Sequence, residues 1–216
     1  MRLTSASNAK ITENTITENG ESGAYVYNAE TVEITNNTFS KNKNGIKAAY
    51  AKLKISSNTI VDNLAYGIFF ETATSTTALQ KNIITGNQIV FRLPASALPD
   101  STNTLTPNKT PIFEVLGNTL LANTTIRVVG SSPNTVAVYH LLDGALNVPA
   151  GIKLNVEAGV VIKQAPASSI SVAGAMQTTG TVTAPVVFTS LTDDLFGGDT
   201  NADQDATSPY SELLEA

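Results

Sequence analysis

An aspartate-rich loop near the end of the chain carries the side chains best suited to chemistry. In TDDLFGGDTNADQD, residues 192–205, acidic and amide side chains alternate with small residues, so their oxygens can converge on a hard cation such as calcium. The loop is not an EF-hand, because Gln204 stands at the sixth position and Tyr210 at the twelfth. The alternative to a calcium site is an acidic, solvated loop. The candidate ligands are Asp193, Asp194, Asp199, Asn201, Asp203 and Asp205.

Other residue types that often perform catalysis are scarce. His140 is the only histidine, which rules out a histidine-pair metal site, and the sequence has no Gly-x-Ser-x-Gly elbow for a Ser/His/Asp triad. The chain has no cysteine, which excludes a thiol nucleophile and zinc thiolate sites. We therefore predict no catalytic residue, and we interpret His140 as an ordinary surface or partly buried side chain.

Composition limits the classes of protein that the chain can belong to. With 216 residues and 42% apolar residues it can form a sizeable core. The balance of 18 acidic against 13 basic residues provides no basic surface for nucleic acid. No apolar run approaches the roughly 18 residues that a membrane helix needs, and the first residues do not form a signal peptide. We expect neither a nucleic-acid partner nor a membrane span.

A nine-residue pattern recurs four times and indicates which elements position the polar side chains. The copies are ITENTITEN from Ile11, ITNNTFSKN from Ile34, ISSNTIVDN from Ile55 and LQKNIITGN from Leu79. A period of 21–24 residues with short strands broken by Asn, Gly and Asp is typical of one coil of a parallel β-solenoid. Equivalent residues of successive coils then stack about 4.8 Å apart. The predicted apolar columns are Ile11–Ile34–Ile55–Leu79 and Ile16–Phe39–Ile60–Ile84.

The recurring asparagines fit the corners of such coils. Asparagine tolerates the left-handed turn conformation, and its amide can bond the amide of the next coil. Stacked amides satisfy one another, as they do in other stacked β assemblies. We therefore predict structural ladders rather than ligands for these residues. The two ladders are Asn14–Asn37–Asn58–Asn82 and Asn19–Asn42–Asn63–Asn87.

One outward strip of the predicted coils is suited to contact sugars. If Ala24, Ile46 and Ile68 point inward, their strand neighbours point outward and stack in columns. The strip mixes aromatic, basic and acidic side chains, but the paired carboxylates of a glycosidase do not recur there. The alternative is a plain exposed face. The candidate carbohydrate-binding residues are Tyr25, Tyr27, Lys47, Phe69 and Glu71.

The coil pattern does not extend evenly along the chain. We interpret residues 1–92 as β-helix coils with asparagine ladders. Residues 93–146 are interpreted as an irregular excursion with short strands, and residues 147–216 as further β-helix strands with the aspartate-rich loop. One continuous solenoid is the first choice, and a division into two domains is the second.

Two parts of the chain resemble known proteins. Residues 147–209, including VPAGIKLNVEAGVVIK and the GGDTN loop, resemble a segment of large bacterial secreted and surface proteins with right-handed parallel β-helix repeats. Residues 11–91 are similar to the repeats of pectate-lyase-like proteins. The resemblance implies calcium in the loop and an extracellular or cell-surface location for the parent protein. Because the chain begins inside a repeat and stops just beyond the loop, we expect an excerpt of a longer protein.

Together these observations predict an all-β fold, a right-handed parallel β-helix with an irregular insertion. The predicted function is a non-catalytic structural or binding module for adhesion or for recognition of a polysaccharide or cell-surface glycan. The alternative is a polysaccharide lyase, glycoside hydrolase or epimerase module whose catalytic residues lie partly outside the chain. A third class, the ice-binding solenoid, would need outward Thr-x-Thr ranks at coil spacing, and we find no regular ranks. Uncapped solenoid ends also predict end-to-end self-association.

Overall fold

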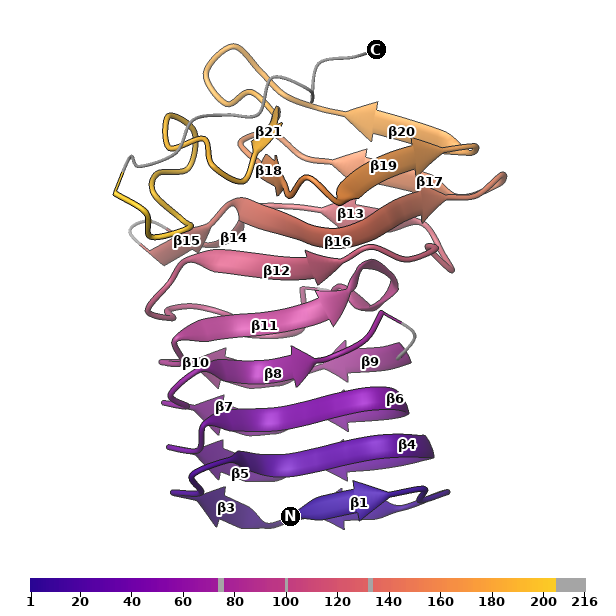
Figure 1. The fold of residues 1–216 in the computed structure, drawn as a ribbon, viewed down its shortest axis with the longest axis vertical. Helices are drawn as coiled ribbons and strands as arrows, with labels where there is room; N and C mark the ends of the chain where they lie inside the picture. Colours follow the sequence, from indigo (N-terminus) through magenta and orange to yellow (C-terminus); the bar gives the residue numbers. More distant parts are fainter. Residues whose placement is uncertain (74–75, 100, 132–133, 205–216) are drawn as a thin grey trace.

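A parallel sheet of stacked coils forms the frame of the molecule. The computed structural model describes residues 1–73, 76–99, 101–131 and 134–204. Each strand of this sheet belongs to a different coil and is paired in parallel with the coils on either side (Figure 1). We call this sheet the first side. Its strands, in order, are β1 (Arg2–Thr4), β4 (Ser22–Thr35), β6 (Asn44–Ser56), β8 (Tyr66–Phe70), β11 (Ile89–Pro94), β12 (Ile112–Leu116), β16 (Val138–Val148), β18 (Val161–Gln164) and β21 (Val187–Ser190).

Two further sides complete each coil. The long strands β4, β6 and β16 turn a corner, and on the second side their later residues pair with β2 (Lys10–Thr12), β9 (Thr76–Gln80) and β19 (Ser168–Val172). The third side is divided into two sheets. The first contains β3 (Thr15–Thr17), β5 (Thr38–Ser40), β7 (Thr59–Val61) and β10 (Ile83–Thr85), and the second contains β13 (Thr124–Ile126), β17 (Lys153–Val156) and β20 (Ala175–Thr178). A short 3₁₀ helix, η1 (Ala95–Ala97), and an antiparallel pair, β14 (Val129–Ser131) with β15 (Asn134–Val136), complete the elements of the described chain.

The interior is filled by the apolar columns that the repeat predicts. The strand register pairs Ile11 with Ile34, Ile34 with Ile55, and Ile55 with Leu79. The second column, from Ile16 to Ile84, is in register in the same way. Removing each such side chain from water stabilises the fold by roughly 1.5–3 kcal/mol. The predicted solenoid, with residues one period apart stacked directly on each other, is confirmed.

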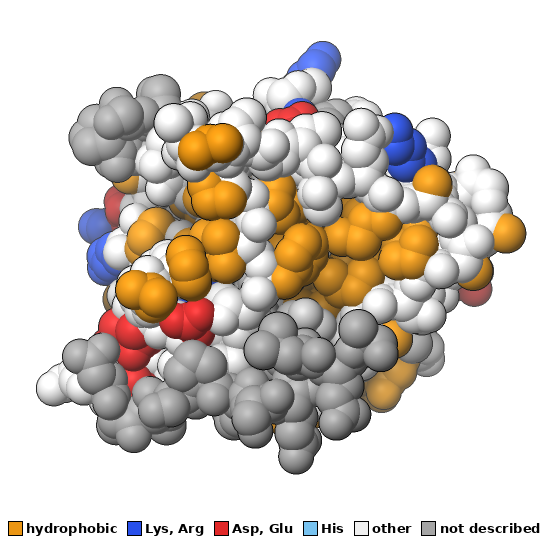
Figure 2. Space-filling view, turned by 90° about the horizontal axis from the view of Figure 1, so that it is seen from above, with side chains coloured by type: hydrophobic (Ala, Val, Ile, Leu, Met, Phe, Trp, Pro, Cys, Tyr) orange, Lys and Arg blue, Asp and Glu red, His pale blue; other side chains and the backbone are white. Residues whose placement is uncertain are grey.

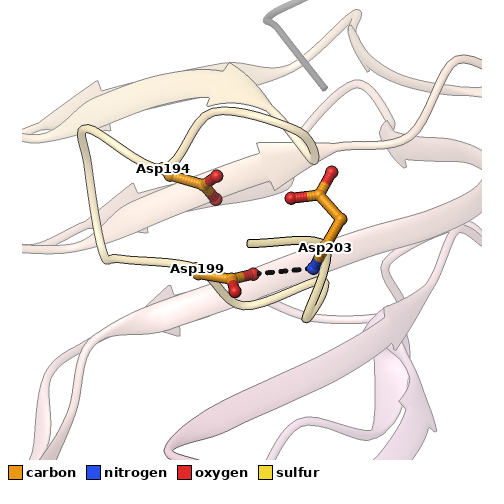
Figure 3. Close-up of side chains that lie close together, drawn as sticks. All are labelled: Asp194, Asp199 and Asp203. Atoms are coloured by element: carbon orange, nitrogen blue, oxygen red, sulfur yellow. Dashed lines mark hydrogen bonds between the residues drawn. The ribbon is translucent and has the colours of Figure 1, made fainter. Parts of the chain in front are cut away.

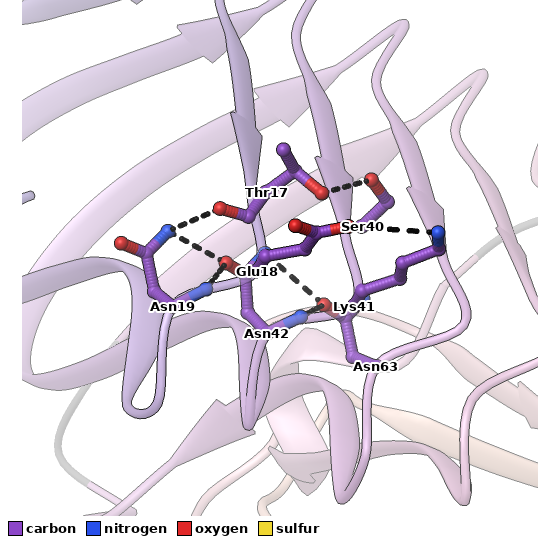
Figure 4. Close-up of polar contacts among 7 residues, drawn as sticks. All are labelled: Thr17, Glu18, Asn19, Ser40, Lys41, Asn42 and Asn63. Carbon is purple, nitrogen blue, oxygen red and sulfur yellow. Dashed lines mark hydrogen bonds and ion pairs between the residues drawn. The ribbon is translucent and has the colours of Figure 1, made fainter.

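The asparagine ladders form as predicted, and the structure shows how they work. The Asn37 amide oxygen accepts hydrogen bonds from the backbone nitrogen of Asn14 at 2.9 Å and from its side-chain nitrogen at 3.0 Å. The Asn37 side-chain nitrogen in turn donates to the amide oxygen of Asn58 at 3.0 Å and to the Ile11 carbonyl at 2.8 Å. The second ladder repeats this arrangement through Asn19, Asn42 and Asn63 (Figure 4). Each amide therefore joins adjacent coils.

The conformation of the corners differs from the expectation. The left-handed residue is the one before each ladder asparagine: Glu13, Asn36, Ser57 and Lys81 have φ between 56° and 58°. The prediction that the ladder asparagines themselves adopt this conformation is wrong. The asparagine is selected at its position because its side chain reaches the backbone and amide groups of the neighbouring coils.

A fifth coil continues both ladders. Asn82 donates to the amide oxygen of Asn103 and Asn87 to that of Asn108, at 3.0 and 3.1 Å between side chains. Residues 103–108, NTLTPN, repeat the Asn-Thr-apolar core of the pattern, but Asp100 stands where the earlier copies begin with Ile or Leu. The segment 93–146, interpreted from the sequence as an irregular excursion, thus contributes ladder residues and the strand β12 to the same stack.

The C-terminal end of the stack exposes apolar side chains. Seen from above, they gather in the middle of this end of the molecule (Figure 2). Val172 of β19 is 43% exposed and Phe188 of β21 is 40% exposed. Within the described ranges, no helix has the length and apolar character needed to span a membrane.

Candidate functional site

The outer face of the first side carries one continuous column of large side chains. The register pairs Arg2 with Tyr25, Tyr25 with Lys47, Lys47 with Phe69, and Phe69 with Arg92. Because alternate residues of a strand point to opposite faces, these side chains point away from the core. Basic and aromatic groups therefore alternate along the axis of the solenoid.

The alternation brings each cation over at least one ring. The Lys47 ammonium lies 5.1 Å from the ring centre of Tyr25 and 5.8 Å from that of Phe69. The guanidinium carbons of Arg2 and Arg92 lie 5.3 and 5.5 Å from the rings of Tyr25 and Phe69. Cation–π contacts at such partly exposed positions contribute about 0.5–1 kcal/mol each. These contacts hold the side chains from Arg2 to Arg92 in one arrangement, and the side chains remain partly exposed to solvent.

Glu71 lies beside the column and contacts two of its members, Tyr25 and Lys47. Its carboxylate accepts a hydrogen bond from the Tyr25 hydroxyl at 2.9 Å and forms an ion pair with Lys47 at 2.9 Å. Burial alone would raise the pKa of Glu71, but the hydrogen bonds from Lys47 and Tyr25 outweigh it and hold the pKa below its usual value. Tyr27 packs 6.3 Å from the Tyr25 ring. The Tyr50 ring centre lies 5.9 Å from that of Tyr27. The structure thus brings together the five predicted carbohydrate-binding residues, and we call them, with Arg2, Tyr50, Tyr66, Arg92 and Glu114, the outer strip.

The outer strip becomes more enclosed toward the later coils. Tyr66 stacks 4.8 Å from the Phe69 ring, and its hydroxyl donates to the Glu114 carboxylate at 2.9 Å. Burial raises the pKa of Glu114, although Tyr66 and Arg92 act in the opposite direction. Burial, together with the Glu114 charge, also raises the pKa of Tyr66. Glu114 is only 9% exposed, and its carboxylate accepts the hydrogen bond from Tyr66 within the protein.

The aspartate-rich loop covers the last part of the same column. Beyond Glu114 the register continues to His140 and Lys163. His140 Nε2 lies 2.8 Å from the Thr200 hydroxyl, and the Lys163 ammonium donates to the carbonyls of Asp193 and Gly198 at 2.6 and 2.7 Å. In Figure 1 this loop, drawn in yellow, descends beside the start of β16.

Glycine and charge both contribute to the seating of the loop. Gly197 has a φ of +78°, and a Cβ atom on it would lie 2.7 Å from the Val138 side chain. Burial lowers the pKa of Lys163, while the charges of Asp194, Asp193 and Asp199 oppose this shift. Burial, with the Lys163 charge, lowers the pKa of His140 to about 4. His140 is therefore neutral at pH 7 and buried under the loop.

Three of the predicted metal ligands converge in this loop. One carboxylate oxygen from each of Asp194, Asp199 and Asp203 lies within 4.8 Å of the others, and the side chains turn toward a common space (Figure 3). Calcium binds oxygen at about 2.3–2.6 Å, so two ligand oxygens of one ion lie at most about 5 Å apart. The observed spacing fits this limit, and the triad could hold a metal ion.

The other predicted ligands have different surroundings. Asp193 accepts a hydrogen bond from the Leu195 backbone at 2.9 Å and another from the Thr189 hydroxyl, so it shapes the turn. Asn201 donates from its side-chain nitrogen to Asp203 at 2.9 Å, next to the triad. Asp205 lies outside the described residues.

The third side carries outward hydroxyl groups in its first coils. Threonine and serine occupy both outward positions in β3 and β5, and Thr17 accepts a hydrogen bond from Ser40 at 3.0 Å. Of β3, β5, β7 and β10, only β3 has the Thr-x-Thr form, so regular Thr-x-Thr ranks do not recur at coil spacing here, as the sequence indicates. Val61 and Ile83 interrupt the ranks in the next two coils. The paired columns are Thr15–Thr38–Thr59–Ile83 and Thr17–Ser40–Val61–Thr85.

Sequence reasoning missed half of the outer strip. Arg2 precedes the first copy of the repeat, and Tyr66 lies at a corner position where the earlier coils have Ser22 and Asn44. Arg92 could have been found by extending the Tyr25 column one further coil. Glu114 gave no such signal, because the copy of the pattern before its strand, residues 100–108, begins with Asp100 instead of an apolar residue.

The fold and the surface together define a class of protein, which is a parallel β-solenoid with a mixed aromatic and charged outer strip. A family model described as the right-handed beta helix region matches residues 1–138. This is more than half of the 216 residues, so the chain belongs to the right-handed β-helix family. Searches of the curated proteins and of the solved structures gave no match.

We predict that His140 makes stability depend on pH. Between pH 6.5 and about 4 the unfolded chain binds a proton on this histidine that the folded chain does not, so stability falls as the pH falls. The loss expected from this group is roughly 2–3 kcal/mol. Urea unfolding of the wild type and of His140→Gln at pH 7 and pH 4.5 measures it. The wild type should lose more stability than the variant, and equal losses would contradict the account.

Proposed function

We propose that the chain is a non-catalytic binding module that recognises carbohydrate through its outer strip. The observation that carries the proposal is the in-register column in which Arg2, Lys47 and Arg92 alternate with Tyr25 and Phe69. The surface so formed is amphipathic: ring atoms offer apolar contact to the C–H faces of sugars, while charged groups and hydroxyls bond to sugar oxygens.

The shape of the site favours an extended ligand. The strip runs along the axis of a rigid stack, and its coils are about 4.8 Å apart, so a polysaccharide chain can contact several coils at once. This geometry supports adhesion to a polysaccharide or a cell-surface glycan. A ligand of this kind would place the protein outside the cell or on its surface.

Binding is favoured over catalysis by the state of the carboxylates. Glu71 is held by Lys47 and Tyr25, and Glu114 is buried against Tyr66. A glycosidase needs one carboxyl group to protonate the leaving oxygen and a second to act on the other face of the bond. Glu71 and Glu114 are already paired with the protein's own donors. Such carboxyl groups are better suited to holding neighbouring side chains in place than to transferring protons to a sugar.

Calcium is the cation that the aspartate triad fits best. Hard oxygen ligands, a loop with small residues and the spacing of the carboxylates all match its coordination. A bound ion would tie the two ends of the loop together over His140 and Lys163. Its role would be to stiffen the aspartate-rich loop where this loop covers the column beyond Glu114.

The glycan proposal is tested with two outer-strip variants. A glycan array identifies a ligand, and affinity electrophoresis or calorimetry then compares the wild type with Phe69→Ala and Tyr27→Ala. An aromatic contact at the centre of an interface is worth about 2 kcal/mol, which is more than tenfold in Kd. We expect each variant to weaken binding at least tenfold.

The control for this experiment is Leu121→Ala, which removes an apolar side chain that is 71% exposed and lies outside the strip. Its affinity should equal that of the wild type. Absence of any glycan ligand, or equal losses in all three variants, would overturn the proposal. Release of reducing ends or unsaturated sugars, abolished by Glu114→Gln, would establish the enzyme alternative instead.

The calcium proposal is tested by thermal unfolding. At a calcium concentration 100-fold above Kd, binding should stabilise the fold by about 2.7 kcal/mol, or roughly 5–10 °C in Tm. The shift should disappear with a chelator and in Asp203→Ala, and it should persist in Glu18→Gln, whose side chain forms only a surface ion pair with Lys41. A wild-type Tm that does not respond to calcium would show that the loop is merely acidic and solvated.

A further inference from the structure

The third side of the solenoid is interrupted by a cavity. The sheet that ends at β10 and the sheet that begins at β13 are separate. Between them, side chains that include Pro99, Ser101 and Leu105 on one side and Thr125, Arg127 and Val129 on the other line a cavity of about 200 Å³. An engineered apolar cavity of about 150 Å³ is large enough to bind benzene. The space can therefore hold one substituted six-membered ring.

Aromatic side chains of the first side form the deep wall of this cavity. Phe91 and Phe113 stack with their ring centres 4.7 Å apart and their planes within 6° of parallel. Tyr139 meets Phe113 edge-on, with ring centres 5.0 Å apart. All three residues line the cavity. Rings of this kind favour an apolar, planar occupant, since offset and edge-to-face contacts are the preferred geometries between aromatic groups.

Among the described residues that line the cavity, Arg127 is the one cation. Arg127 lines the cavity, and its Nε atom is buried without a hydrogen-bond partner. Within the described ranges no carboxylate forms an ion pair with Arg127. The main chain at this residue is held in place, because the Tyr139 hydroxyl donates to the Arg127 carbonyl at 2.7 Å. A guanidinium can bind a carboxylate through two parallel hydrogen bonds, and Arg127 is the lining residue that can supply them.

We infer that this cavity is a binding site for a small aromatic carboxylate. The ring lies against Phe113 and Tyr139, and the carboxylate pairs with Arg127. The site is separate from the outer strip, because these rings belong to the inward-facing positions of the first side. It takes a single-ring acid rather than a sugar chain, since the cavity volume excludes a polymer and its deep wall is apolar.

Benzoate is the probe for this site. Binding to the wild type is followed by protein NMR chemical shifts and by calorimetry, with benzyl alcohol as the uncharged comparison. Benzoate should bind saturably and at least tenfold more tightly than benzyl alcohol. The Arg127→Gln variant should bind benzoate at least tenfold more weakly than the wild type, with no change in its affinity for benzyl alcohol.

The control is Lys43→Gln, which removes a cation whose side chain is 54% exposed, outside both the cavity and the outer strip. It should bind benzoate as the wild type does. If Arg127→Gln does not fold, Arg127→Lys provides the second variant: it keeps the charge, loses the fork, and should also weaken benzoate binding. No saturable binding of benzoate, equal affinity for the alcohol, or equal losses in Lys43→Gln would overturn the inference. Because the probe is not a sugar, failure here leaves the glycan proposal standing.

Discussion

Every coil of this protein depends on its neighbours for its hydrogen bonds. The backbone nitrogen of Asn58 donates to the Asn82 amide oxygen at 3.0 Å, and its side-chain nitrogen donates to the Ile34 carbonyl at 2.8 Å. Both groups are buried, and a buried polar group left unpaired costs about 1–3 kcal/mol. A coil that slipped by one residue would lose these bonds and turn its apolar side chains outward. The stack is therefore fixed in one register.

That register determines the surface as well as the core. Arg2, Tyr25 and Lys47 are far apart in the sequence, and they touch only because their strands are Cα partners in successive coils. The same column continues under the aspartate-rich loop to Lys163, whose ammonium bonds two loop carbonyls. The outer strip and the loop that covers its end are consequences of one stacking arrangement, and the cavity lies where the third side is interrupted.

The sequence predicts this architecture best where the chain repeats itself. Ile11, Ile34 and Ile55 could be assigned to one column because each begins a copy of the same pattern, and Tyr25, Lys47 and Phe69 followed from strand parity. Prediction failed where local signals were lost. With Asp100 in place of an apolar residue, the copy containing Asn103 was not recognised. The contact between His140 and Thr200 depends on how a loop folds back over a distant strand, and no periodicity encodes it.

The most direct test of the register uses a pair of introduced cysteines, since the chain has none of its own. Glu33 and Lys54 are Cα partners on adjacent coils, and Lys52 lies two residues earlier on the same strand. Adjacent coils are about 4.8 Å apart, within the Cα range of a disulfide, whereas the diagonal neighbour is about 8 Å away. Under mild oxidation, Glu33→Cys with Lys54→Cys should form an intramolecular disulfide, and Glu33→Cys with Lys52→Cys should not. Faster or equal cross-linking of the diagonal pair would contradict the stacked register on which the core, the outer strip and the cavity all depend.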